Sequence, residues 1–165
     1  AAGRPVAVVG HRGGPLDALR GDPAVAAWCD GANTASLVEA RQREPSLAVV
    51  VDAADELIDH PVETVLREVA HLVDRDGGLL VVGANATALS SMYRGIAYEV
   101  ARHRTGVLLG PTSTAEGGVL GVRAPVDRAA RPGRGHVVQR GSCTPLQVAL
   151  PDSPPIPVAA PRAAG

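Results

Sequence analysis

Short, continuous apolar runs alternate with amphipathic segments over residues 5–110, and this alternation limits the folds open to the chain more than any other feature. The clearest runs are PVAVVG at 5–10, LAVVV at 47–51 and LLVV at 79–82, and a fourth strand is expected at 107–109. A run that is apolar at every position is typical of a parallel strand buried on both faces. The sequence therefore predicts an α/β fold, with helices on both sides of a parallel sheet in three layers.

The segments between these runs have the spacing of helices. Apolar side chains recur at helical intervals within residues 61–74: Val62, Val65, Leu66, Val69, Leu72 and Val73. Further helices are predicted at 34–43 and 90–103, and a short one at 15–20, where proline suits the first helical position. Because helices alternate with the strands, the strands are expected to run parallel to one another.

The last third of the chain has a different texture. Short strands are predicted at 119–122, 136–139 and 146–150, separated by loops rich in glycine and proline. This pattern indicates a small antiparallel C-terminal extension to the sheet. Residues 151–165 are rich in Pro and Ala and have little to bury, so we expect a mobile tail there, after one folded domain at 1–150.

Composition excludes several functions for the chain as given. Its 16 basic residues are all Arg and face 17 acidic residues, so the net charge of −1 gives no overall basic field for nucleic acid. A P-loop needs a Lys, and the chain has none. The two cysteines and five histidines have no metal-type spacing. The apolar runs are far shorter than the roughly 20 residues of a membrane helix, so a soluble protein is expected.

Asp52 is the candidate metal-binding residue. It directly follows the apolar run 47–51, and open parallel sheets bind ligands outside the carboxyl ends of their strands. A Walker B strand has this pattern, and its Asp holds Mg²⁺ or a water bound to Mg²⁺. The alternative is that Asp52 caps the next helix. The next residue is Ala53, where hydrolysing enzymes usually have an acid, so no catalytic residue is assigned.

Three other polar segments each have two interpretations. The glycine loop 11–14 follows the first strand but lacks the Lys and hydroxyl of a phosphate-binding loop, so a simple turn competes with a binding role. Asn85 follows the run 79–82, where nucleotide motors place a polar sensor of the γ-phosphate, and a plain turn residue is the alternative. The arginines within 102–104 and 131–140 are candidates for DNA contact or a solvated surface.

The order of segments carries a family resemblance. The strand that ends at Asp52 is followed by YRGIAYEVARHRTGVLLGP (93–111), GGVLGVRAP (117–125), RPGRGHVVQRG (131–141) and LQVAL (146–150). This succession resembles the C-terminal half of an FtsK/SpoIIIE-type motor ATPase domain. The resemblance is strongest to the actinobacterial branch that includes the type VII secretion ATPases of the EccC type, and it covers about residues 5–150.

The resemblance implies a RecA-like P-loop NTPase fold, of which residues 1–150 are a part. It matches Asp52 to the Walker B aspartate and Ala53 to the catalytic acid of active members. It matches Asn85 to the Gln of an ATQRP-like segment, and Arg134 to the Arg of a glycine-containing loop near a subunit boundary. Asp52, Asn85 and Arg134 are thus the cofactor-binding candidates. ATP and Mg²⁺ are implied for the intact protein, and no cofactor for this chain alone.

The function implied is that of the C-terminal portion of a degenerate ATPase domain of a type VII secretion motor, which acts in ATP binding and regulation and docks protein substrates or neighbouring ATPase domains. The implied partners are the upstream half of the same domain, other ATPase domains or further copies, and the export signal of a secreted protein. The implied location is cytoplasmic, at the cytoplasmic face of a membrane-bound secretion complex. Two alternatives stay open: a fragment of an ATP-dependent DNA translocase, and a non-catalytic α/β protein-interaction module.

Overall fold

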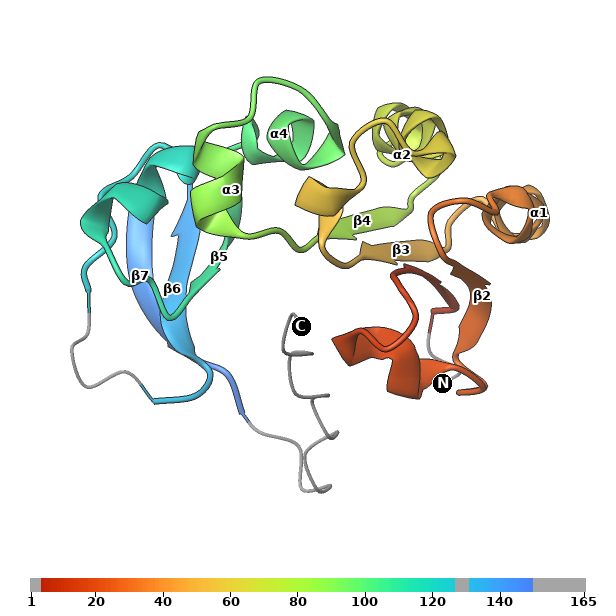
Figure 1. Cartoon of the computed structure of the whole chain (residues 1–165), viewed down its shortest axis with the longest axis horizontal. Helices are drawn as coiled ribbons and strands as arrows, with labels where there is room; N and C mark the ends of the chain where they lie inside the picture. Colours follow the sequence, from red (N-terminus) through yellow and green to blue (C-terminus); the bar gives the residue numbers. More distant parts are fainter. Residues whose placement is uncertain (1–3, 127–130, 150–165) are drawn as a thin grey trace, which may run out of the picture. The chain divides into compact units, whose positions relative to one another are not determined.

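The computed structural model describes residues 4–126 and 131–149 (Figure 1). These residues belong to two units, which meet in the sequence between Gly83 and Ala84. The first unit contains a parallel sheet of four strands and the second an antiparallel sheet of three. The predicted α/β class is therefore confirmed, with the antiparallel strands in a sheet of their own.

The parallel sheet has the strand order β2-β1-β3-β4. Its strands are β1 (Val6–Val9), β2 (Val25–Cys29), β3 (Ala48–Val51) and β4 (Leu79–Val82). Val9 pairs with Cys29 on one side and with Val51 on the other, so three strands end level with one another. The chain moves from β1 to one side of the sheet and then returns to the other, which creates a topological switch point between β1 and β3.

Helices cover the parallel sheet unequally. α1 (Ala35–Arg43) and α2 (Pro61–Leu72) lie on one face, and the 3-10 helix η1 (Pro15–Leu19) lies on the other (Figure 1). The apolar face predicted for α2 is buried, with Val62 and Leu66 at 0% exposure and Val69 at 2%. Burying each such side chain contributes about 2 kcal/mol, so α2 is fixed mainly by its contact with the sheet.

The predictions for the first unit hold with one omission. The expected strands at 5–10, 47–51 and 79–82 contain β1, β3 and β4, and the three expected helices contain η1, α1 and α2. Strand β2 was missed. Its sequence, VAAWC, has two alanines with low strand propensity, and Ala26 is exposed because β2 is an edge strand.

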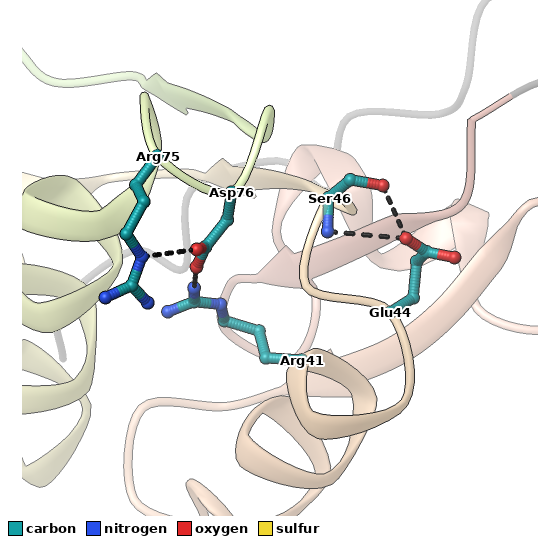
Figure 2. A network of polar contacts seen from close by, with 5 residues as sticks. All are labelled: Arg41, Glu44, Ser46, Arg75 and Asp76. Atoms are coloured by element: carbon teal, nitrogen blue, oxygen red, sulfur yellow. Dashed lines mark hydrogen bonds and ion pairs between the residues drawn. The ribbon is translucent and has the colours of Figure 1, made fainter.

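An ion-pair cluster joins α1 to the loop after α2 (Figure 2). Arg41 Nη2 lies 2.8 Å from one carboxylate oxygen of Asp76, and Arg75 Nε lies 2.9 Å from the other. The side chains of Arg41 and Asp76 are only 14% and 11% exposed, so water screens this pair less than an ordinary surface pair. At the end of α1, Glu44 accepts hydrogen bonds from the N–H and hydroxyl of Ser46. These contacts fix the amino ends of β3 and β4.

The second unit has its own sheet, in the order β5-β6-β7. Its strands are β5 (Thr105–Leu109), β6 (Arg134–Gln139) and β7 (Ser142–Gln147). It also contains the helices α3 (Ala86–Ser90) and α4 (Ile96–Ala101) and the 3-10 helix η3 (Thr114–Leu120). A small core lies on one face of this sheet and consists of Leu108, Leu120, Ala124 and Val138.

Two predictions for strands in the second unit need correction. The strand predicted at 107–109 is confirmed as part of β5, but it pairs antiparallel with β6 and is not part of the parallel sheet. The segment 119–122 is the end of η3 and the turn at Gly121, whose φ is 75°. A capping box between Ser113 and Glu116 starts this helix and satisfies its first N–H groups. The capping box therefore favours a helix over these residues more strongly than the apolar run VLGV favours a strand.

Two further boundaries differ from the sequence prediction. The helix expected over 90–103 is shorter in the structure: it contains α4 and only the last residue of α3, because Gly95 before α4 has a φ of 98°, which no helix continues. Of the strand predicted at 146–150, only residues 146 and 147 belong to β7. The strand predicted at 136–139 is confirmed and lies within β6. The predicted tail 151–165 lies outside the described residues. Within the described ranges, no helix is long and apolar enough to cross a bilayer.

Candidate functional site

The carboxyl edge of the parallel sheet brings together the residues that end its strands. Asp52 donates its N–H to the carbonyl of Val9 at 2.9 Å, and Gly83 donates its N–H to the carbonyl of Val51 at 2.8 Å. These bonds continue the strand ladder one residue beyond β3 and β4. Open α/β sheets bind ligands at this edge, close to the switch point, which here lies between β1 and β3.

Asp52 lies at that switch point beside Gly10. A Cβ built on Gly10 would lie 3.9 Å from Asp52 Cβ and 3.6 Å from a ring carbon of Trp28, so the three residues are close neighbours at this edge. Asp52 is half-buried, and its Oδ1 accepts the N–H of Ala53 at 3.0 Å. In the described part of the chain, Oδ2 of Asp52 has no protein partner. One oxygen is therefore open to water or a metal ion.

Ala53 forms the turn from β3 into the 3-10 helix η2 (Ala54–Glu56). Its φ of 49° and ψ of 45° place it in the left-handed region, which is unusual for alanine. Ala53, and not Asp52, is the N-cap residue of η2, so the cap alternative for Asp52 is not realised. The turn is closed by the N–H of Ala54, which donates to the carbonyl of Gly83 at 2.9 Å. A methyl group accepts no proton, so position 53 supplies no general base.

The glycine loop after β1 is held by Asp17. The N–H of Gly13 donates to Asp17 Oδ2 at 3.0 Å, and the guanidinium of Arg20 pairs with Oδ1. These two contacts, the Gly13 bond first, hold the pKa of Asp17 below its ordinary value of 3.8. Arg20 also lies over the ring of Trp28, 4.2 Å from its centroid, in a cation–π contact. Asp17 and Arg20 thus give the loop a structural role as a turn.

Asp30 and Cys29 lie at the end of β2 on the same edge. Oδ1 of Asp30 accepts the N–H groups of Asn33 at 3.1 Å and Ala32 at 3.3 Å, and these bonds lower the pKa of Asp30. Burial raises the pKa of the Cys29 thiol, which donates to the carbonyl of Asn33 at 2.9 Å. Sequence reasoning could not assign Asp30 to this edge because it missed β2. Among described residues, no three His, Cys, Asp or Glu side chains are grouped for a metal ion.

The other two predicted cofactor-binding residues belong to the second unit. Asn85 is the N-cap of α3, and its Oδ1 accepts the N–H groups of Thr87 at 2.9 Å and Ala88 at 3.1 Å. This is the role that the turn-residue alternative describes, and such a cap is worth about 1 kcal/mol. Arg134 is exposed at the start of β6. Asp52 belongs to the first unit, so the three predicted residues are divided between the two units.

Sequence reasoning missed a groove in the second unit, which we name the α3–α4–η3 groove. It has a volume of about 800 Å³ and is lined only by residues 89–121. Part of its lining is apolar: Leu89, Met92, Ala101 and Val119. Ligand sites commonly combine a concave apolar surface of this size with a few polar groups.

Two tyrosines and two arginines also line this groove. They are Tyr93, Tyr98, Arg102 and Arg104. Tyr93 is 85% exposed, and within the described part of the chain the guanidinium groups of Arg102 and Arg104 have no polar partner. The chain has only three aromatic residues, so two of them within six positions was a signal available from the sequence. The groove itself also needs η3, which sequence reasoning did not predict and whose last two residues it assigned to a strand at 119–122.

The charge of the chain divides unevenly between its two parts. Residues 1–83 contain seven Arg and thirteen acidic residues, for a net charge of −6. Residues 84–165 contain nine Arg and four acidic residues, for a net charge of +5. The net charge of the whole chain is near zero, but residues 84–165 are basic. The near-neutral total therefore does not exclude a polyanionic partner for this part of the chain.

These features define an α/β protein with two candidate sites. One is the carboxyl edge of the parallel sheet in the first unit, and the other is the α3–α4–η3 groove of the second unit, which two arginines line. Comparisons with protein-family models, curated proteins and solved structures found no significant match to this chain.

Proposed function

We propose that the chain is the C-terminal portion of a RecA-like, FtsK/SpoIIIE-type ATPase domain that has become degenerate. In this proposal it binds nucleotide together with its upstream half, without hydrolysing it, and docks protein substrates or neighbouring ATPase domains of a type VII secretion motor. One observation carries the proposal: Asp52 ends a central parallel strand, and Ala53 follows it. An aspartate in that place holds the Mg²⁺ of a nucleotide, and Ala53 cannot polarise the attacking water.

The position of β4 at the edge of the described sheet supports the proposal that an upstream segment completes the domain. Among the described strands, β4 pairs with β3 alone, although its sequence LLVV is apolar at every position. Leu79 is 49% exposed and Val81 is 45% exposed. An apolar strand at a sheet edge is a template for a further strand. The proposal assigns that place to upstream polypeptide that carries the P-loop strand and the Lys that this chain lacks.

The test is Mg²⁺-dependent nucleotide binding by the intact domain, measured by calorimetry. Asp52→Ala is expected to weaken binding in Mg²⁺ about tenfold, because a charged contact of this kind is worth roughly 1.5–3 kcal/mol. The matched control is Asp22→Ala, which removes an exposed acid from the turn before β2 and is expected to leave binding unchanged. Equal affinities of wild type and Asp52→Ala would remove the nucleotide-binding part of the proposal.

The charge of the second part favours a second candidate function, a fragment of a DNA translocase. Phosphate contacts dominate such binding and make it strongly salt-dependent. The net charge of +5 over residues 84–165 provides cations for them. A salt-dependent shift of duplex DNA by the intact protein, weakened by Arg131→Glu, would favour this function over protein docking.

A further inference from the structure

We propose that the α3–α4–η3 groove binds an acidic peptide segment of a partner protein that carries one or two bulky apolar side chains. The inference rests on the docking function proposed above and names its ligand class. Every residue that lines the groove belongs to the second unit, so the site needs no assumption about the first.

The charge of the groove is not neutralised from within. Arg102 and Arg104 line it without a polar partner in the described part of the chain, and no acidic residue lines it. The acid of η3, Glu116, is already used, since its carboxylate accepts the N–H groups of Thr112 and Ser113. Two such guanidinium groups that line one groove favour carboxylates, which they bind through paired hydrogen bonds.

The rest of the lining suits an apolar side chain. Tyr93 leaves 85% of its surface to solvent, and it lies in a groove that Met92 and Leu89 also line. Tyrosine and arginine are the residues that most often supply binding energy in protein interfaces, and methionine adapts its shape to varied partners. A ligand that covers the ring of Tyr93 would gain apolar contact and carboxylate pairing together.

These features favour a peptide over a nucleic acid strand. Single-stranded nucleic acid is bound by a cationic groove that follows many phosphates, with aromatic rings as stacking platforms. Here two arginines line the groove together with apolar side chains, among them Leu89, Ala101 and Val119. Such a surface matches aliphatic side chains flanked by acids more closely than a row of phosphates.

The test is fluorescence anisotropy with the full chain and a labelled synthetic peptide in which Asp and Glu flank a central Leu-Ile pair. Arg102→Glu and Arg104→Glu are each expected to weaken binding about tenfold, and Tyr93→Ala about fivefold or more. The control Arg123→Glu makes the same charge change at an exposed site outside the groove, and less than about a twofold change is expected there. Circular dichroism melts establish that each variant is folded.

A second peptide separates groove binding from simple charge attraction. It keeps the acids and replaces Leu-Ile by Gly-Ser, and it is expected to bind at least about tenfold more weakly. Absence of peptide binding, equal binding of both peptides, or an equal loss in Arg123→Glu would overturn the inference. Competition by a single-stranded oligonucleotide that binds more tightly than the peptide would overturn it in favour of nucleic acid. Failure here with Mg²⁺-dependent nucleotide binding intact would leave the nucleotide-binding part of the proposed function standing.

Discussion

At the scale of single residues, the hairpin between β6 and β7 contains a residue in an unfavourable conformation. The ladder pairs Gln139 with Ser142, so the turn consists of Arg140 and Gly141, with φ values of 50° and 82°. Two positive φ angles define the turn type in which Asn-Gly is preferred, because most residues with a Cβ are strained there.

Replacing this arginine tests the interpretation of the turn. Arg140→Asn is expected to raise the free energy of unfolding by about 0.5–1 kcal/mol, as measured by urea denaturation. The comparison variant, Arg140→Ala, removes the same side chain but keeps a residue that disfavours positive φ, so it is expected to give no such gain. Equal stabilisation by both would show that the arginine side chain, and not the backbone, is the cause.

Asp17 gives the glycine loop a pH dependence. Its pKa in the folded chain is lowered, mainly by the N–H of Gly13 and by Arg20. A carboxyl group with a lowered folded pKa stabilises the fold above its ordinary pKa, here 3.8, and this stabilisation is lost as pH falls through the lowered value. The amide resonance of Gly13 in NMR spectra is therefore expected to stay constant from neutral pH to near 3.8 and to shift below it. In Asp17→Asn that acid transition should be absent, and its persistence would contradict the assignment.

Single residues differed in how far the sequence could predict them. Asp52 and Ala53 could be found because a strand end followed by its turn is a local pattern. The N-cap role of Asn85 depended on where α3 begins, which weak helical periodicity did not reveal. Arg102 and Arg104 could be named but not placed, since their groove requires η3, whose residues are distant from α3 in sequence.

At the scale of elements, the contact between Asp76 and Arg41 holds α1 against the loop after α2 (Figure 2). Asp76→Ala is expected to lower the free energy of unfolding by about 2 kcal/mol, because it leaves the largely buried Arg41 without its carboxylate. Glu44→Ala removes an exposed acid from the same cluster and is expected to cost about 0.5 kcal/mol or less. Chemical denaturation of both variants measures the difference, and similar losses would contradict the importance given to burial.

The predictability of elements followed the range of the interactions that form them. β1, β3 and β4 are apolar at every position, so local sequence was sufficient. The partner of the segment 107–109 could not be found in this way, because β5 pairs with β6, which lies more than twenty residues later. Strand β2 has a weak local signal and is formed by its pairing with β1.

At the scale of the whole molecule, the two units divide the proposed tasks. The first unit has an acidic net charge and places Asp52 at the carboxyl edge of its parallel sheet, where a nucleotide with Mg²⁺ is expected. The second has a basic net charge and contains the α3–α4–η3 groove, where an acidic partner is expected. In the proposed function, a domain with these two binding surfaces and without a catalytic acid serves in docking and regulation.

ATP turnover by this chain together with the upstream half that the proposed function assigns to it tests that proposal most directly. Turnover is expected at background in the wild type, with no further decrease in Asp52→Ala, because Ala53 provides no group to activate water. Robust turnover in the wild type that Asp52→Ala abolishes would contradict it.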